Sequence, residues 1–219
     1  MKKAFIKKAF ILLMIAVTLA ITACGSQDEL RGLANTEEVS TFEQILRSLV
    51  DMQNFRAIAT VEFHSNKGVN IYETTQHARV SGEYRVEVTG PANVAGSVTA
   101  FDGQQIIQFN SRVNGRVSMQ VQETPERSEI FLTSFIKNYL QSDNISVRVS
   151  DMNEGLRTVF EATVPGGHHY LSFSRLWVDN STLLPVKLII FDQDGAERIV
   201  VTYHVFEFNV DLDDALFTV

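Results

Sequence analysis

The stretch Phe55-Arg56-Ala57-Ile58-Ala59-Thr60-Val61-Glu62-Phe63-His64 decides the fold of this chain. Every second residue from Phe55 to Phe63 is apolar, and the residues between them are charged or polar apart from Ile58. Successive side chains of a β-strand point to opposite faces of the sheet. The alternation therefore predicts a strand with one buried face and one solvated face.

The same two-residue period continues through most of the chain that follows. Asp102-Gly103 and Asn114-Gly115 supply the positive backbone angles that tight hairpins need, and Pro165-Gly166-Gly167 predicts another turn. The chain is therefore expected to form about ten strands. Besides the strand at residues 55–63, they are expected at residues 71–78, 80–88, 97–101, 105–109, 117–121, 145–149, 156–164, 170–178, 186–191 and 198–208. Strands that follow one another through short turns pair as antiparallel neighbours.

Two segments have helical rather than strand periodicity. Ser40 and Glu43 have the spacing of a capping box at the start of an apolar i, i+3, i+4 pattern, and residues 125–142 (PERSEIFLTSFIKNYLQS) predict a second, largely buried helix. The whole pattern predicts an α+β fold that is mainly β. We expect one large curved antiparallel sheet, a half-barrel, with about two helices packed on its concave face.

The N-terminus has the layout of a lipoprotein signal peptide at residues 1–23. Four lysines precede an apolar run that is too short to cross a membrane comfortably, and Ile21-Thr22-Ala23-Cys24 resembles a bacterial lipobox. That resemblance implies cleavage after Ala23 and a diacylglyceryl lipid on Cys24. The alternative is an ordinary signal peptide followed by a chance cysteine.

The segment after the predicted cleavage site divides into a tether and a domain. Residues 24–35 are expected to be the lipidated cysteine and a polar, flexible tether with a reach on the order of 20 Å. Residues 36–219 are long enough for a single domain. Cys24 is the sole cysteine, so no disulfide within the chain is possible.

Net charge narrows the choice of partners. Removing residues 1–23 leaves 15 basic residues against 26 acidic ones, a net charge of −11. Nucleic acid and anionic lipid headgroups both require clustered positive charge, so neither is an expected partner.

The C-terminal third carries motifs of a known family. Leu176-Trp177-Val178-Asp179-Asn180-Ser181-Thr182-Leu183-Leu184-Pro185-Val186-Lys187, the turn at Asp194-Gly195 and the ending Asp213-Asp214-Ala215-Leu216-Phe217 resemble the LolA-like superfamily, as does the hairpin at residues 101–105. The resemblance covers nearly the whole mature domain. It agrees with Pro185 at the start of a strand and Phe217 closing the core.

Within that superfamily, residues 129–140 together with the lipobox are similar to spore-germination lipoproteins of the GerS type. This resemblance implies a non-catalytic lipoprotein that binds and activates a cell-wall N-acetylmuramoyl-L-alanine amidase of the CwlD type, for muramic-δ-lactam formation in the spore cortex. It implies a location on the outer face of the cytoplasmic membrane, or in the forespore intermembrane space. The candidate partner-binding residues lie on the second helix: Phe131, Phe135, Lys137 and Tyr139.

Motifs for catalysis or metal binding are not found. His168 and His169 are adjacent and would point to opposite faces of a strand, and the other histidines lie on separate predicted strands. Asp211, Asp213 and Asp214 lack the spacing of a calcium loop, so a solvated terminal cap is the simpler interpretation. With no nucleophile motif, we expect no enzymatic activity, no metal, and no cofactor beyond the lipid on Cys24.

Two alternatives stay open. The 15 phenylalanines are compatible with an apolar concave groove that carries lipid or lipoprotein, although the apolar second helix favours a filled core. An unprotected strand edge is also compatible with a homodimer formed by strand pairing or exchange.

Overall fold

The computed structural model describes residues 36–121, 129–152 and 155–218. The predicted signal peptide, Cys24 and the tether lie outside these residues. The chain divides into two units, residues 1–40 and residues 41–219. In the first unit, the described residues are the first five of helix α2 (Thr36–Asp51). Apart from the start of α2, everything below concerns the second unit.

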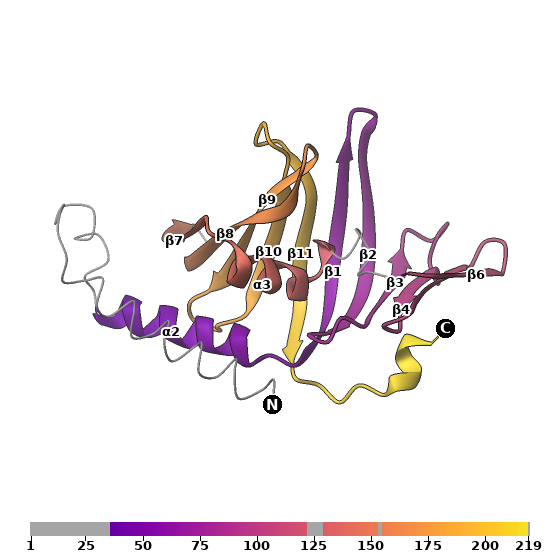
Figure 1. Cartoon of the computed structure of the whole chain (residues 1–219), viewed down its shortest axis with the longest axis horizontal. Coiled ribbons are helices and arrows are strands. Elements are labelled where there is room, and N and C mark those ends of the chain that lie inside the picture. The colour runs from indigo at the N-terminus through magenta and orange to yellow at the C-terminus, as the bar shows by residue number, and fades with distance from the viewer. Residues whose placement is uncertain (1–35, 122–128, 153–154, 219) are drawn as a thin grey trace. The chain divides into compact units, whose positions relative to one another are not determined.

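Eleven strands form one antiparallel sheet in the order β6-β5-β4-β3-β2-β1-β11-β10-β9-β8-β7. The strands are β1 (Asn54–Ser65), β2 (Gly68–Arg79), β3 (Tyr84–Gly90), β4 (Val98–Phe101), β5 (Gln105–Asn110), β6 (Gly115–Gln120), β7 (Ile145–Met152), β8 (Gly155–His168), β9 (Leu171–Asp179), β10 (Pro185–Phe191) and β11 (Glu197–Phe208). The sheet is open and curved, as Figure 1 shows, which confirms the predicted fold class.

Almost every pair of neighbours in the sheet is also consecutive in sequence. The exception is the central pair, where Val61 on β1 faces Val201 on β11. The two edge strands, β6 and β7, are therefore consecutive along the chain, and the segment between them must cross from one edge to the other. Helix α3 (Leu132–Gln141) lies in that connection, in front of the strands in Figure 1.

Two predicted strand boundaries are wrong, each for a local reason. The strand expected from residue 80 begins at Tyr84, because Gly82 has a φ of +121° and the Arg79 amide donates to the Glu83 carbonyl at 2.8 Å, which closes a turn. The turn expected at residues 165–167 is instead part of β8, which continues to His168 through an irregular register with β9.

The helices also begin at different residues from those predicted. Helix α2 begins at Thr36, so Ser40 lies inside it and is not its N-cap. The second predicted helix is shorter than expected, since α3 begins at Leu132 after the N-cap residue Phe131. Among the described residues, none of the helices has both the length and the apolar character that a membrane span requires.

The main core lies between the concave face of the sheet and the two helices. Ile45 and Leu49 of α2 and Leu132 and Phe135 of α3 are buried in one cluster with the inward residues of the strands. Phe160 on β8 joins both helices to the sheet, with ring centroids 5.9 Å from Phe42 and 5.6 Å from Tyr139. The prediction that the helices pack on the concave face is therefore confirmed.

The C-terminal segment closes the core as the motif suggested. Phe217, in the short helix η3 (Asp214–Phe217), is buried beneath the Arg79 guanidinium at 4.7 Å. Asp213 caps η3 by accepting the Ala215 amide at 2.9 Å, and Asp214 pairs with Arg79 at 2.6 Å. These two aspartates thus stabilise the terminal segment, which is how the sequence was interpreted.

Candidate functional site

An apolar cavity of about 550 Å³ lies on the concave face, beside the segment that leads into α3. Its floor comes from inward residues of strands β1 to β4, and its wall comes from Glu129, Ile130 and Phe131. The floor residues are Val61, Phe63, Asn70, Tyr72, Thr74, Tyr84, Val86, Val88 and Thr99, and Leu171 and Ile199 complete the lining. The alternation of each strand brings these side chains to the same face.

Aromatic rings lie toward both ends of the cavity. Tyr84 packs against Phe131 with ring centroids 4.6 Å apart, and against Phe101 at 5.7 Å. Phe63 and Tyr72 meet edge to face at 6.0 Å. Because the Tyr84 ring touches the residue that caps α3, the position of this helix and the shape of the cavity are coupled.

Glu129 is the acidic group of the cavity wall. Burial raises the pKa of its carboxyl, while a 3.2 Å hydrogen bond from the Asn138 side chain and the charge of Lys137 oppose that rise. A half-buried carboxylate at the wall of an apolar cavity is stabilised by a ligand group that donates a hydrogen bond or carries positive charge, because either one compensates for its lost hydration.

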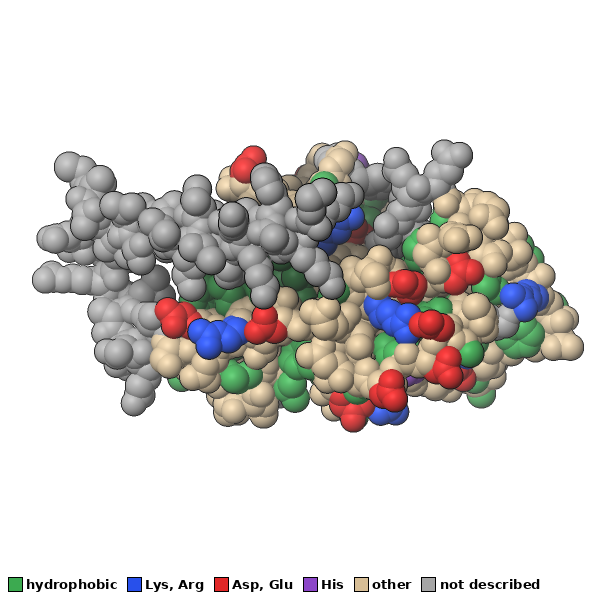
Figure 2. Space-filling view, turned by 60° about the horizontal axis from the view of Figure 1, so that its bottom comes forward, with side chains coloured by type: hydrophobic (Ala, Val, Ile, Leu, Met, Phe, Trp, Pro, Cys, Tyr) green, Lys and Arg blue, Asp and Glu red, His purple; other side chains and the backbone are tan. Residues whose placement is uncertain are grey.

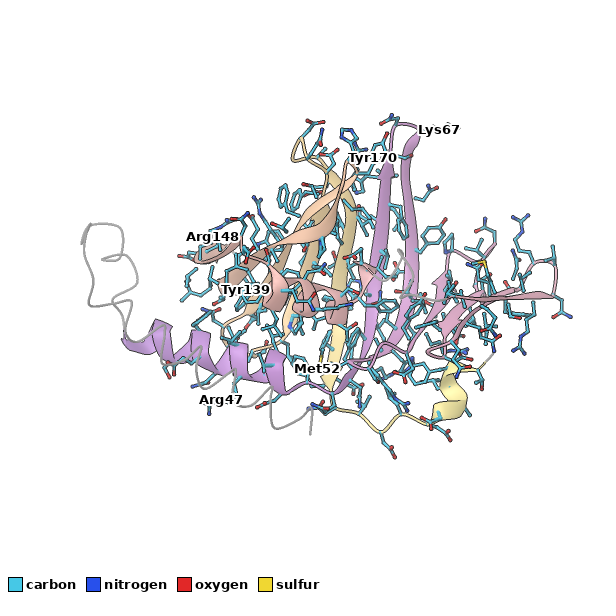
Figure 3. The ribbon with its side chains drawn as sticks, in the orientation of Figure 1. Arg47, Met52, Lys67, Tyr139, Arg148 and Tyr170 are labelled. Carbon is cyan, nitrogen blue, oxygen red and sulfur yellow. The ribbon has the colours of Figure 1, made fainter. Side chains whose placement is uncertain are left out.

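The four predicted partner-binding residues divide into two groups. Phe131 and Phe135 are 1% and 2% exposed, so they position the helix and offer no surface to a partner. Lys137 is exposed and Tyr139 is partly exposed. Tyr139 lies between α3 and β8 (Figure 3). Leu140, 54% exposed, adds apolar surface next to Lys137. The exposed end of α3, which we call its accessible face, includes Lys137, Leu140 and Gln141, with the partly exposed Tyr139 at its border.

The concave face is neither fully filled nor fully open. The apolar sequence of the second helix predicted that the concave face would be filled. Phe131, Leu132 and Phe135, at and within α3, do fill part of it. The cavity over β1 to β4 remains beside it. Sequence reasoning missed its polar lining, Asn70, Tyr72 and Thr74, although their spacing of two is the signal that would have assigned them to a single face.

The histidines and acidic residues do not form a metal centre in the part of the chain that the structure describes. No group of three or more His, Cys, Asp or Glu side chains there could hold an ion. His204 instead contacts the Thr60 hydroxyl at 2.7 Å, and that hydroxyl lies 3.3 Å from both oxygens of Glu73. This cluster lies on the convex face, on the solvent side of strands β1, β2 and β11.

The family motif of residues 176–187 forms the β9–β10 turn. The Asp179 carboxylate accepts the backbone amides of Ser181 and Thr182 at 2.8 and 2.9 Å and pairs with Arg157. Leu183 has a φ of +59°, and Pro185 begins β10. Residues 179–185 of the motif therefore specify a turn, and their role is structural.

The fold and its cavity define a class of protein, in which an open antiparallel half-barrel presents an apolar, partly filled concave face. A family model for YdcC-like sporulation proteins matches residues 6–217, and the chain belongs to that family. Comparison with curated protein sequences gives no significant match.

Several solved structures are similar to this chain. An uncharacterised conserved protein from Thermus thermophilus is 14% identical, with a TM-score of 0.51, 81% of this chain covered and 92% of that chain, and it shares the fold. The complex of the CwlD amidase with the GerS lipoprotein from Clostridioides difficile is similar at 26% identity and a TM-score of 0.49. The match covers 85% of this chain and 100% of that chain. A LolA superfamily protein from Nitrosomonas europaea is 16% identical, with a TM-score of 0.43. The match covers 80% of this chain and 96% of that chain.

Proposed function

We propose that this chain is a lipid-anchored, non-catalytic sporulation protein that binds and activates a cell-wall amidase of the CwlD type, and so supports muramic-δ-lactam formation and spore germination. The observation that carries the proposal is membership of a sporulation family across residues 6–217. The amidase is the partner that the resemblance of residues 129–140 and the lipobox to GerS-type lipoproteins implies.

The accessible face of α3 is our proposed contact surface for the amidase. Lys137, Tyr139 and Leu140 lie within one turn of the helix, and α3 is held in place by its buried residues. A rigid surface with an exposed cation, an aromatic ring and an aliphatic side chain has the composition of a protein-binding site.

The test of this proposal is an activation assay with the full chain and a CwlD-type amidase from the same organism, on purified cell walls. We expect the chain to form a complex with the amidase and to raise its turnover. Lys137→Glu should weaken the complex at least tenfold. Arg47→Glu makes the same charge change on the exposed face of α2 (Figure 3) and should leave it unchanged. An amidase that neither binds nor responds to the chain would overturn the proposal.

The proposed location is the outer face of the cytoplasmic membrane, or the forespore intermembrane space, with the lipid on Cys24 as anchor. Two or more acyl chains hold a protein on a bilayer far more firmly than one chain does. Cys24→Ala should therefore move the chain from the membrane fraction to the soluble fraction, and should abolish incorporation of labelled fatty acid. If the Cys24→Ala variant still incorporates the labelled fatty acid, Cys24 is not the modified residue.

A second candidate function is lipid or lipoprotein binding, which the cavity of about 550 Å³ favours. Its apolar floor suits an acyl chain, and Glu129 at the wall suits a polar head that donates hydrogen bonds. Mass spectrometry of organic extracts of the purified chain, together with titration of an apolar fluorescent probe, tests this function. Absence of both bound lipid and probe binding would remove it.

A further inference from the structure

A second apolar cluster lies on the convex face of the sheet, opposite the helices. Ile189, Phe191 and Val200 are buried there, with Phe173 and Trp177 packed against them. All of these residues belong to strands β9, β10 and β11, whereas the buried residues of α2 and α3 belong to the concave cluster. Within the described residues, this cluster is therefore covered only by neighbouring side chains.

Arg175 lies over two aromatic rings of the cluster. Its guanidinium lies 5.3 Å from the Phe173 ring and 4.9 Å from the Phe191 ring, and it pairs with Glu161. The two rings stack at 4.8 Å with an angle of 9° between their planes. Trp177 packs against the same cluster and remains partly exposed, so a ligand could reach its ring.

The strand register puts Trp177 in a straight row with two cations. Arg148 on β7 faces Val159 on β8, Val159 faces Trp177, Trp177 faces Lys187 on β10, and Lys187 faces Thr202 on β11. Residues directly opposite one another on neighbouring strands share a face, so the row crosses five strands over about 19 Å. We call this set, Arg148, Trp177, Lys187 and Thr202, the convex row. Figure 3 labels Arg148 on the edge strand β7.

The cations of the convex row are available to a ligand. No ion pair joins Arg148 or Lys187 to an acidic side chain among the described residues. Arg157 and Arg175, on the same face of the sheet, are by contrast paired with Asp179 and Glu161. Figure 2 shows basic and acidic side chains beside one another on one face of the molecule. In an acidic chain, two unpaired cations on either side of a tryptophan form a local site for negative charge.

From this arrangement we infer that the convex row binds a linear glycan strand that carries carboxylates. The Trp177 ring would stack on the apolar face of a sugar, Lys187 and Arg148 would pair with carboxylates on either side, and the Thr202 hydroxyl would hydrogen-bond to the sugar. The extended, linear shape of the row matches a polymer. A membrane surface fits less well, because attraction to anionic lipid takes a larger basic cluster and the Glu161 carboxylate lies in the next row.

This inference extends the proposed function by naming a cell-wall polymer as a second ligand, at a face that does not include α3. The two proposals can therefore fail separately. Failure of amidase activation would leave glycan binding untouched, and the reverse also holds.

Trp177 is the sole tryptophan of the chain, so its fluorescence reports the site directly. The full chain should be titrated with soluble oligosaccharides from cell-wall glycan that keep their carboxylates. We expect a saturable change in emission. Lys187→Gln and Arg148→Gln should each raise the dissociation constant about tenfold, and Lys187→Glu should raise it further. Lys67→Glu, at the exposed β1–β2 turn (Figure 3), is the matched control and should have no effect.

Three outcomes would overturn the inference. These are no change in Trp177 emission with any glycan, equal binding of an uncharged oligosaccharide of the same length, and a response only to vesicles that contain phosphatidylglycerol. Thermal unfolding of each variant shows whether it is folded. Activation of the amidase by Lys187→Gln, measured in parallel, should equal that of the parent chain.

Discussion

Asp192 is the acidic side chain on which the β10–β11 turn depends. It is 1% exposed and accepts hydrogen bonds from the amides of Asp194 and Ala196 and from Arg198, at 3.0, 2.8 and 2.7 Å. Burial alone would raise the pKa of this carboxyl, but the hydrogen bonds from Ala196 and Arg198 outweigh it and hold the pKa below its ordinary value. The charged form is therefore bound more tightly in the folded chain than in the unfolded chain.

The sign of that shift predicts how Asp192→Asn changes stability with pH. When the pKa of a carboxyl is lower in the folded chain than in the unfolded chain, the carboxyl stabilises the fold at pH values above its pKa in the unfolded chain. This stabilisation is lost as the pH falls through its pKa in the folded chain. Asp192→Asn should therefore lower the melting temperature clearly at pH 7, and the difference should shrink as the pH falls below about 4.

Thermal unfolding followed by circular dichroism between pH 2.5 and pH 7 is the measurement for Asp192→Asn. Asp194→Asn, two residues away and exposed, should match the parent chain throughout. A difference between parent and Asp192→Asn that does not change with pH would mean that Asp192 acts only through its shape.

At the scale of elements, α3 is fixed to the sheet by a few large side chains. Phe135 is buried in the core and stacks on Tyr139 with centroids 6.0 Å apart. Phe135→Ala should lower the free energy of unfolding by about 3–5 kcal/mol, because a buried aromatic ring is replaced by a cavity. Lys137→Ala, exposed on the same helix, should change it by less than about 0.5 kcal/mol. Urea unfolding of the two variants gives both values, and equal losses would contradict this packing.

The edge strand β6 exposes apolar side chains that a second copy of the chain could cover. Val117 and Met119 are 67% and 59% exposed, and β6 is paired on one side only. If the chain forms a dimer through this edge, Met119→Lys should abolish it without changing the stability of the monomer. Val113→Lys, in the adjacent turn and 73% exposed, is the control. Light scattering across a concentration series is the measurement, and a parent chain that stays monomeric would exclude this dimer.

The elements were predictable where local chemistry decides them. Alternation located the strands, and hairpin turns lie at Asp102-Gly103 and just before β6, as expected. In the second turn the positive φ, 47°, belongs to Asn114, and Gly115 is already the first residue of β6. The predicted start of β3 was wrong because Val80, Gly82 and Tyr84 keep the two-residue period through a turn, and the strand begins at Tyr84. The cavity was out of reach because its lining depends on where α3 crosses the sheet. The convex row was equally out of reach, because it depends on register across five strands.

At the scale of the whole molecule, the strand order divides the sheet into two series of strands, although one core cluster spans both. Strands β1 to β6 form one series of local hairpins, and β7 to β11 form another. Within the sheet, the two series pair with each other at β1 and β11, which joins residues more than a hundred positions apart, such as Val61 and Val201. Joining distant segments costs more loop-closure entropy than closing a hairpin does.

This topology predicts that the β1–β11 pairing forms late in folding. Val201→Ala and Val178→Ala remove the same atoms from residues that are both 0% exposed, but Val201 lies on β11 at the central pair and Val178 lies on β9 within local hairpins. Each should lower the free energy of unfolding by about 2 kcal/mol.

For Val201→Ala, nearly all of this loss should appear as faster unfolding, by about 30-fold, since interactions absent from the transition state affect only the unfolding rate. Val178→Ala should also slow folding, because local hairpins form earlier. Stopped-flow folding and unfolding over a range of urea concentrations separates the two rates. A Val201→Ala chain that folds more slowly while unfolding at the parent rate would show instead that the central pairing belongs to the folding nucleus.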